Sequence, residues 1–191
     1  MDKEDIVSKF PFEKTIVVGF EFGGLDEVGR PRRQPLKPSA QQWLREKLPV
    51  ENLFGICKVP YLAARNSAVR DIVLPRADEF KWAIFIDNDV TITHPGVEHF
   101  LAAEADVVSC TCKMRQADAW ATPDALHTPF WRCRVEVFQS IPAPWFEYPF
   151  SEDGCDVLGC DCMQFARKAK AAGFSICHAG HCGHACTGSW C

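Results

Sequence analysis

The amino-acid sequence predicts an α/β fold with a mixed, mostly parallel β-sheet flanked by helices. Runs of β-branched or apolar residues alternate along the chain with stretches of helical periodicity. Trp82 to Ile86 is apolar at every position, which is typical of a central strand covered on both faces. With 191 residues and 47% hydrophobic content, the chain can form the hydrophobic core of one domain, which we expect over 1–191. Residues 1–14 and 188–191 are expected to be peripheral to that domain.

The first half of the chain is expected to place strands and helices around a basic loop. Thr15 to Phe20 predicts a buried strand, because it is rich in β-branched residues and leads into glycines. Gly29 to Ser39 contains three prolines and four cations, so we expect an exposed loop without regular structure. The other expected elements are a helix over about Ala40 to Lys47, a strand over Leu53 to Val59 and a helix over Leu62 to Val73.

The second half continues the alternation. Phe130 to Phe138 alternates in a way that predicts a half-buried strand. A helix over about Cys160 to Ala172 is expected to end at Gly173 with a left-handed cap. The remaining elements are a helix over about Gly96 to Ala103, a strand over Val107 to Cys112 and a strand over Phe174 to Cys177.

Composition argues against several classes of protein. The 21 Lys and Arg against 25 Asp and Glu give a net charge of −4, which disfavours wholesale coating of nucleic acid. No apolar run approaches the roughly 20 residues that span a bilayer, and the start MDKEDIVSKF lacks the features of a secretion signal. We therefore expect no membrane contact and a cytoplasmic location. The cysteines number 11, which is odd, and in a reducing cytosol most should be thiols.

The sharpest chemical feature is Asp87-Asn88-Asp89, placed where the apolar strand ends. Two carboxylates one residue apart at a strand end can both turn toward one hard cation, such as Mg²⁺ or Mn²⁺. The oxygens of a nucleotide diphosphate would complete its coordination. The alternative is a solvated turn, because Asp and Asn favour turns. The apolar strand in front of the motif favours the cation site.

Through this motif the chain resembles the GT-A glycosyltransferases, whose DxD motif ends an apolar strand. The resemblance covers roughly Thr15 to Gly188, and three further segments fit in order. LAARNSAVRDIV resembles the helix that offers polar side chains to the nucleotide. PWFEYPF followed by GCDCMQFARKAKAAGFSI resembles the acceptor-side loop and helix, and CGHACTG the segment that returns a histidine to the metal. The resemblance implies a GT-A-like (Rossmann-like) domain of small phage or bacterial type.

The resemblance also implies roles for single residues. Asp87 resembles the DxD residue that contacts ribose and metal, Asp89 the principal metal ligand and His184 the third ligand. Asp161 falls where the family places its general base, although Cys160 stands where the family often has Glu. Reserve candidates for the base are Asp156, Glu152 and Asp153.

The implied activity is transfer of a hexose from a nucleotide-diphosphate sugar, a UDP-sugar above all, to an acceptor hydroxyl. A bound Mn²⁺ or Mg²⁺ ion would neutralise charge on the departing diphosphate. A carboxylate would take the proton of the attacking hydroxyl. Inversion follows if Asp161 lies opposite the leaving group, and retention stays open.

Polar residues near the motif are candidates for nucleotide contacts. Arg65, Asn66 and Arg70 are expected away from the apolar stripe of their helix, where Arg suits phosphate and Asn suits base or ribose. The alternative for these three is the solvent face of a surface helix. Asn88 is a further candidate within the motif. An aromatic platform for a sugar or base, or else part of the core, is the expectation for Trp145, Phe146 and Tyr148.

Two other functions compete with this one. The tail from Cys177 to Cys191 is rich in His and Cys, which suggests a zinc-stabilised module that binds nucleic acid or protein. The alternative is a set of buried thiols without a metal. Cys182 and Cys186 have suitable spacing, but the chain contains no Cys-x-x-Cys; further ligands would be Cys155, Cys160 and Cys162. A nucleotidyltransferase would also use paired carboxylates, but the first strand is not followed by a glycine-rich triphosphate loop.

The basic loop makes nucleic acid a candidate acceptor, because its cations can meet phosphates. These cations are Arg30, Arg32, Arg33 and Lys37. The chain resembles compact phage-type transferases that glycosylate hydroxymethylated bases in DNA, and such a base would have to be flipped out. The protein would then work in the cytoplasm of the infected host. A protein or glycan acceptor is equally compatible with these residues.

Overall fold

The computed structural model of the chain describes residues 10–58, 60–113, 126 and 128–184. Its main feature is a seven-stranded sheet with the order β4-β1-β5-β8-β7-β9-β6. β8 is antiparallel to both of its neighbours and β6 is antiparallel to β9, whereas the other neighbours are parallel. The strands are β1 (Thr15–Phe20), β4 (Leu53–Ile56), β5 (Trp82–Asp87), β6 (Val90–Thr91), β7 (Val107–Lys113), β8 (Phe130–Arg134) and β9 (Ile176–His184). The predicted α/β class is confirmed.

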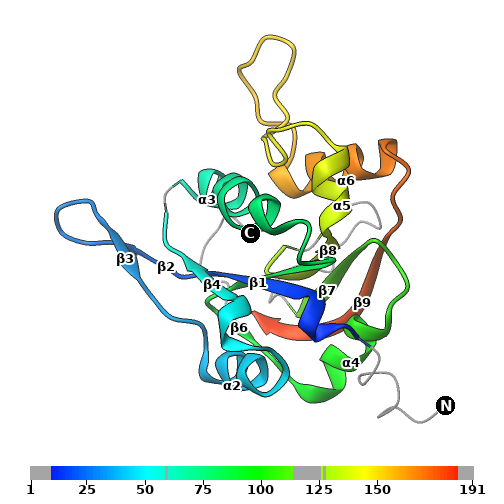
Figure 1. Ribbon diagram of the computed structural model, residues 1–191. Helices are drawn as coiled ribbons and strands as arrows, with labels where there is room; N and C mark the ends of the chain where they lie inside the picture. The colour runs from blue at the N-terminus through cyan, green and yellow to red at the C-terminus, as the bar shows by residue number, and fades with distance from the viewer. Residues whose placement is uncertain (1–9, 59, 114–125, 127, 185–191) are drawn as a thin grey trace.

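Helices cover both faces of this sheet (Figure 1). One face carries α3 (Tyr61–Ser67), α5 (Val135–Ser140) and α6 (Asp161–Ala171), and the other carries α2 (Pro38–Lys47) and α4 (His94–Ala102). Short turns are η1 (Phe12–Lys14), η2 (Val50–Asn52), the π-helical η3 (Ala68–Val73) that continues α3, and η4 (Leu74–Arg76). Gly173, beyond α6, has the predicted left-handed conformation with φ 89°. No helix in the described part of the chain is long and apolar enough to cross a bilayer.

Two hydrophobic clusters lie on the two faces of the sheet, because successive residues of a strand point in opposite directions. In β5, Ala83 and Phe85 belong to the cluster that includes residues of α3 and α6. Ile84 and Ile86 belong to the cluster that includes residues of α2 and α4. The all-apolar strand is thus central, as predicted, and Asp87 is its last residue.

A two-stranded hairpin projects from the body of the protein beyond β1 (Figure 1). Its strands are β2 (Phe22–Leu25) and β3 (Pro31–Arg33), and residues 22–33 are called the arm below. The prediction that the basic segment lacks regular structure is wrong for β3. Pro31 is tolerated because it is the first residue of an edge strand, where it need not donate a ladder hydrogen bond.

Further boundaries differ from the prediction, and the strand expected over Leu53 to Val59 ends at Ile56. The strand expected over Phe130 to Phe138 ends at Arg134, and α5 begins at the next residue. Val135 and Phe138 are both buried and stand three residues apart, a spacing that suits one face of a helix. The same residues also fit the alternating pattern of a strand, so the sequence pattern did not decide between the two. The last strand is longer than expected, because β9 keeps pairing with β7 and β6 through the Gly, His and Cys segment.

Candidate active site

The candidate site lies at the carboxyl end of β5. Asp87 pairs in register with Phe20 at the end of the parallel strand β1, so both strands end at one edge of the sheet. Asp89 follows in the turn to β6, and both aspartates are half-buried. The Asp87 backbone N–H donates to the carbonyl of Pro129 over 2.8 Å, and the Tyr61 hydroxyl donates to Asp87 Oδ1. Two carboxylates are therefore presented, partly shielded from water, where ligands bind in α/β sheets.

Asn88, between the two aspartates, connects this turn to the arm. Its backbone N–H donates to the Phe20 carbonyl over 3.1 Å. Its side-chain Nδ2 donates to the Phe22 carbonyl over 3.0 Å and lies 3.4 Å from the Gln34 carbonyl. The Asn88 side-chain amide is thus engaged at the base of the arm. A nucleotide contact for Asn88 stays a prediction.

The backbone of His184 comes close to the aspartate turn. Val90, the residue after Asp89, pairs with His184 in the antiparallel β6–β9 ladder, and Thr91 pairs with Gly183. The His184 side chain lies outside the described residues. Among described side chains, no group of three or more His, Cys, Asp or Glu is arranged to hold a metal ion. Metal binding by Asp87, Asp89 and His184 therefore stays a prediction.

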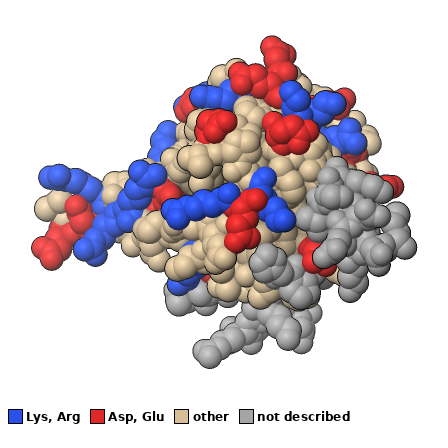
Figure 2. All heavy atoms as spheres, turned by 60° about the horizontal axis from the view of Figure 1, so that its bottom comes forward, with Lys and Arg blue, Asp and Glu red and all other residues tan. Residues whose placement is uncertain are grey.

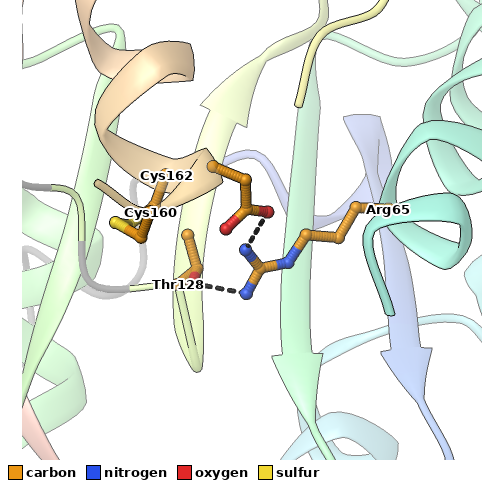
Figure 3. The surroundings of a disulfide bond; sticks show 5 residues. Arg65, Thr128, Cys160 and Cys162 are labelled. Carbon is orange, nitrogen blue, oxygen red and sulfur yellow. Dashed lines mark hydrogen bonds and ion pairs between the residues drawn. A yellow bond between two sulfur atoms is a disulfide. The ribbon is translucent and has the colours of Figure 1, made fainter. Parts of the chain in front are cut away.

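Arg65 and Asp161 form a buried ion pair. Arg65 Nη1 lies 2.6 Å from Asp161 Oδ2, and Arg65 Nη2 also donates to Thr128 Oγ1 (Figure 3). Arg65 is 5% exposed and Asp161 is 7% exposed. The alternative that Arg65 faces solvent is wrong, and so is the expectation that it lies away from the apolar stripe. Arg65 precedes the buried Val69 by one helical turn, so it shares the inward face, and Asp161 compensates its charge.

Tyr61 joins this pair to Asp87. The Arg65 guanidinium carbon lies 4.4 Å from the centroid of the Tyr61 ring, a cation–π contact. Burial lowers the pKa of Arg65, but Tyr61, Asp161 and Asp87 raise it to a higher net value. Burial, and then the charge of Asp87, raise the pKa of Tyr61 well above its usual value. The site thus contains one permanent cation and a neutral phenol that donates to Asp87.

The other predicted nucleotide contacts have structural partners. Asn66 Nδ2 donates to the Phe146 carbonyl over 2.7 Å, and Asn66 Oδ1 accepts from the Phe146 N–H over 3.1 Å. Arg70 is exposed, and its Nε lies 2.6 Å from Asp71 Oδ1 in an ion pair. A nucleotide contact for either residue stays a prediction.

The aromatic segment divides between core and surface. Trp145 and Phe146 are buried in the cluster under α6, which supports their expectation as core residues. The Trp145 Nε1–H donates to the Phe138 carbonyl over 2.9 Å. Tyr148 is 43% exposed. An aromatic platform built from all three is therefore wrong, because two of the rings are used in packing.

A disulfide joins Cys160 to Cys162, on either side of Asp161 (Figure 3). The sequence prediction of mostly thiols did not single out this pair. Cys57, Cys133, Cys155 and Cys177 are free thiols. The disulfide removes two of the suggested zinc ligands, and Cys182 is buried in the core.

Sequence reasoning missed Tyr61 and Thr128. Tyr61 stands four residues before Arg65, a spacing that brings two side chains together on a helix. That spacing was the available signal. Thr128 contacts Arg65 across 63 positions of sequence, and nothing in the local pattern indicates such a contact.

No protein-family model and no curated protein matches this chain. Among solved structures, the A197 protein from STIV is similar with a TM-score of 0.52 at 14% identity, covering 88% of this chain and 83% of that one. A protein from Desulfovibrio desulfuricans G20, proposed to be a nucleotide-diphospho-sugar transferase, has a TM-score of 0.43 at 8% identity, covering 90% and 82%. The similarity to A197 supports the fold and assigns no activity.

Proposed function

We propose that this chain is a single-domain, metal-dependent glycosyltransferase that moves a sugar from a nucleotide-diphosphate sugar, such as a UDP-sugar, to an acceptor hydroxyl. The observation that carries the proposal is the position of the Asp87–Asp89 turn at the carboxyl end of the central strand, beside the pairing of Val90 with His184. Substrates of α/β proteins bind beyond the carboxyl ends of the strands. Two carboxylates at this edge suit a cation that grips a diphosphate.

Asp87, Asp89 and His184 would hold the Mn²⁺ or Mg²⁺ ion. Carboxylate oxygens suit both ions, and an imidazole nitrogen is compatible with Mn²⁺. The pairing of Val90 with His184 keeps the histidine backbone beside the carboxylates, which fits this set of ligands. When bound, the ion would neutralise the charge that develops on the diphosphate leaving group.

Asp161 is the proposed general base. The acceptor oxygen bonds to the anomeric carbon as the bond from that carbon to the diphosphate oxygen breaks, and the hydroxyl proton passes to the Asp161 carboxylate. Arg65 pairs with Asp161 and stacks on Tyr61, whose hydroxyl reaches Asp87. The proposed base and the proposed donor site thus share one support. An attack from the face opposite the leaving group would invert the anomeric carbon.

The arm is the proposed contact with the acceptor. Lys and Arg gather along it, with Asp and Glu near its tip (Figure 2). Arg30, Arg32 and Arg33 are all exposed, and Arg33 forms an ion pair with Glu21. Because the arm leaves β1 next to Asn88, a nucleic acid held along it would lie near the aspartate turn. A hydroxymethylated base in DNA is the proposed acceptor.

Calorimetric titration with UDP or GDP, with and without Mn²⁺, tests the donor site. We expect the wild-type chain to bind one of these nucleotides in a Mn²⁺-dependent way, and Asp89→Asn to lose that binding. Asp78→Asn is the matched control, because Asp78 is exposed in a turn away from the site. Wild-type protein that binds neither nucleotide, and is not stabilised by them against heat, would contradict the proposal.

A further inference from the structure

We infer that Tyr61 is a positioning residue that fixes the Asp87 carboxylate for metal binding, and that Arg65 acts on this site by bracing the Tyr61 ring. The inference rests on the proposed function, because it concerns the ligand Asp87. Tyr61 matches no motif and contacts Asp87 across 26 positions of sequence. Its role follows from three sets of contacts.

The first contact orients Asp87. The Tyr61 hydroxyl donates to Asp87 Oδ1 and so restrains the orientation of the carboxylate. Donors of this kind, one step removed from the metal, fix the rotamer of a ligating carboxylate. The Tyr61 hydroxyl supplies the proton of this hydrogen bond, because an ionised carboxylate can only accept.

The second contact fixes the Tyr61 ring from the sheet side. The ring packs edge-on against Phe20, with centroids 5.3 Å apart and an interplanar angle of 61°. Phe20 is the last residue of β1 and pairs with Asp87 in the ladder. The Tyr61 ring therefore packs against the same pair of strands that carries the Asp87 carboxylate. This packing keeps the Tyr61 hydroxyl and the Asp87 carboxylate in a fixed relative position.

The third contact is the cation over the ring. The Arg65 guanidinium lies over it at 4.4 Å and is itself held at two points, by Asp161 and by Thr128. Arg65 Nε is buried without a hydrogen-bond partner among the described groups. A buried donor without a hydrogen-bond partner costs free energy. The guanidinium therefore keeps an orientation that serves the ion pair and the ring contact, although that orientation leaves Nε without a hydrogen bond. Arg65 thereby braces Tyr61.

Binding of Mn²⁺ tests the inference without requiring turnover. The free Mn²⁺ signal in electron paramagnetic resonance, recorded at saturating UDP, gives the Mn²⁺ affinity. Tyr61→Phe keeps the ring contacts and removes only the hydroxyl, and we expect it to weaken Mn²⁺ binding about 10-fold, as loss of an outer donor does. The chain has one other tyrosine, and its exposed position makes Tyr148→Phe the matched control, with expected wild-type affinity.

Arg65→Lys separates bracing from charge. Lysine keeps the positive charge near the site but loses the planar fork, so we expect a several-fold loss of Mn²⁺ affinity. In the Tyr61→Phe background the same change should have no further effect, because the hydroxyl that Arg65 positions is gone. Arg76→Lys is the control, since Arg76 also stacks on a ring, that of Phe54, away from the site.

The outcomes separate the inference from the proposed function. Wild-type protein that binds Mn²⁺ and UDP while Tyr61→Phe binds them equally well overturns the inference and leaves the proposed function standing. A full effect of Arg65→Lys in the Tyr61→Phe background overturns the bracing role of Arg65. Wild-type protein without any Mn²⁺-dependent UDP binding overturns the proposed function and the inference with it. A purely structural Tyr61 would lower the melting temperature without changing the Mn²⁺ affinity.

Discussion

Asn88 and Phe22 are joined by a hydrogen bond of 3.0 Å from the Asn88 side-chain amide to the Phe22 carbonyl. The middle residue of the acidic turn therefore holds the first residue of the arm. Because the Asn88 backbone also donates to Phe20, the end of β1 and the start of the arm share one anchor. Asn88 thereby connects the arm to the proposed metal site.

Asn88→Ala should loosen the arm. Loss of one partly buried hydrogen bond costs about 1 kcal/mol, which corresponds to about fivefold more opening. Limited trypsin digestion followed by mass spectrometry would report this as faster cleavage after Arg32 and Arg33 in β3. Gln42→Ala is the control, because Gln42 is exposed on α2 and its side-chain amide donates to Glu46 within the same helix. Equal cleavage rates in wild type and Asn88→Ala would mean that this amide does not anchor the arm.

Removing either member of the Arg65–Asp161 pair should destabilise the fold. Each single change, Arg65→Met or Asp161→Asn, leaves the remaining member buried without its partner, at a cost of about 3–5 kcal/mol. The double variant should lose less than the sum, by about 0.5–3 kcal/mol, because no unpaired charge remains. Urea unfolding measures the free energies.

Arg70→Met is the control for this cycle. Arg70 is exposed and pairs with its sequence neighbour Asp71, so its loss should leave the free energy of unfolding unchanged. If the two single costs add without coupling in the double variant, Arg65 and Asp161 do not support each other in solution.

The fold class and the acidic turn could be predicted because both depend on local pattern. An apolar run such as β5 has to be buried on both faces wherever it lies in the sheet, and polar residues that follow it are left at an edge. The pairing of Arg65 with Asp161 could not be predicted, because it joins positions 96 residues apart. A charged side chain suggests exposure until its partner is known.

The local sequence pattern gave a wrong secondary structure for two segments. Three prolines suggested an irregular basic segment, but Pro31 sits where an edge strand tolerates it, so β3 forms. Alternation suggested a strand through Phe138, yet the buried residues of α5 satisfy a helical spacing equally well. In both cases the tertiary neighbours, and not the local pattern, decided the structure.

The exposed arginines of the arm should contribute to binding of nucleic acid. Arg30→Ala with Arg32→Ala removes two cations, and each lost phosphate contact should reduce the slope of log affinity against log salt by about 1. Gel-shift titrations with duplex DNA at several salt concentrations measure this slope. The matched control is Arg45→Ala with Arg167→Ala, which removes two exposed cations from α2 and α6. An affinity unchanged by the arm substitutions would argue for an acceptor other than nucleic acid.

Asp106 should make stability depend on pH in the acid range. Its Oδ2 accepts from Ser175 Oγ over 2.6 Å and from the Ser175 N–H over 2.9 Å. Its Oδ1 lies 3.1 Å from Arg134 Nε. The Ser175 side chain above all, with smaller help from the Ser175 backbone and Arg134, lowers the pKa of Asp106. Since the folded state binds this proton less tightly than the unfolded state, the stabilisation is present above about pH 4 and is lost as pH falls through the lowered pKa.

Asp106→Asn removes this titration while keeping the shape of the side chain. At pH 6 we expect the variant to be less stable than wild type by about 1–3 kcal/mol, the usual contribution of hydrogen bonds to a charged group. The difference should shrink as pH falls below about 4, because wild-type Asp106 becomes protonated as well. Other acids titrate identically in both proteins and cancel, so urea unfolding at pH 6, 4 and 3 isolates Asp106. Ser175→Ala should move stability in the same direction, and a difference that stays constant across this range would show that Asp106 is not held by Ser175.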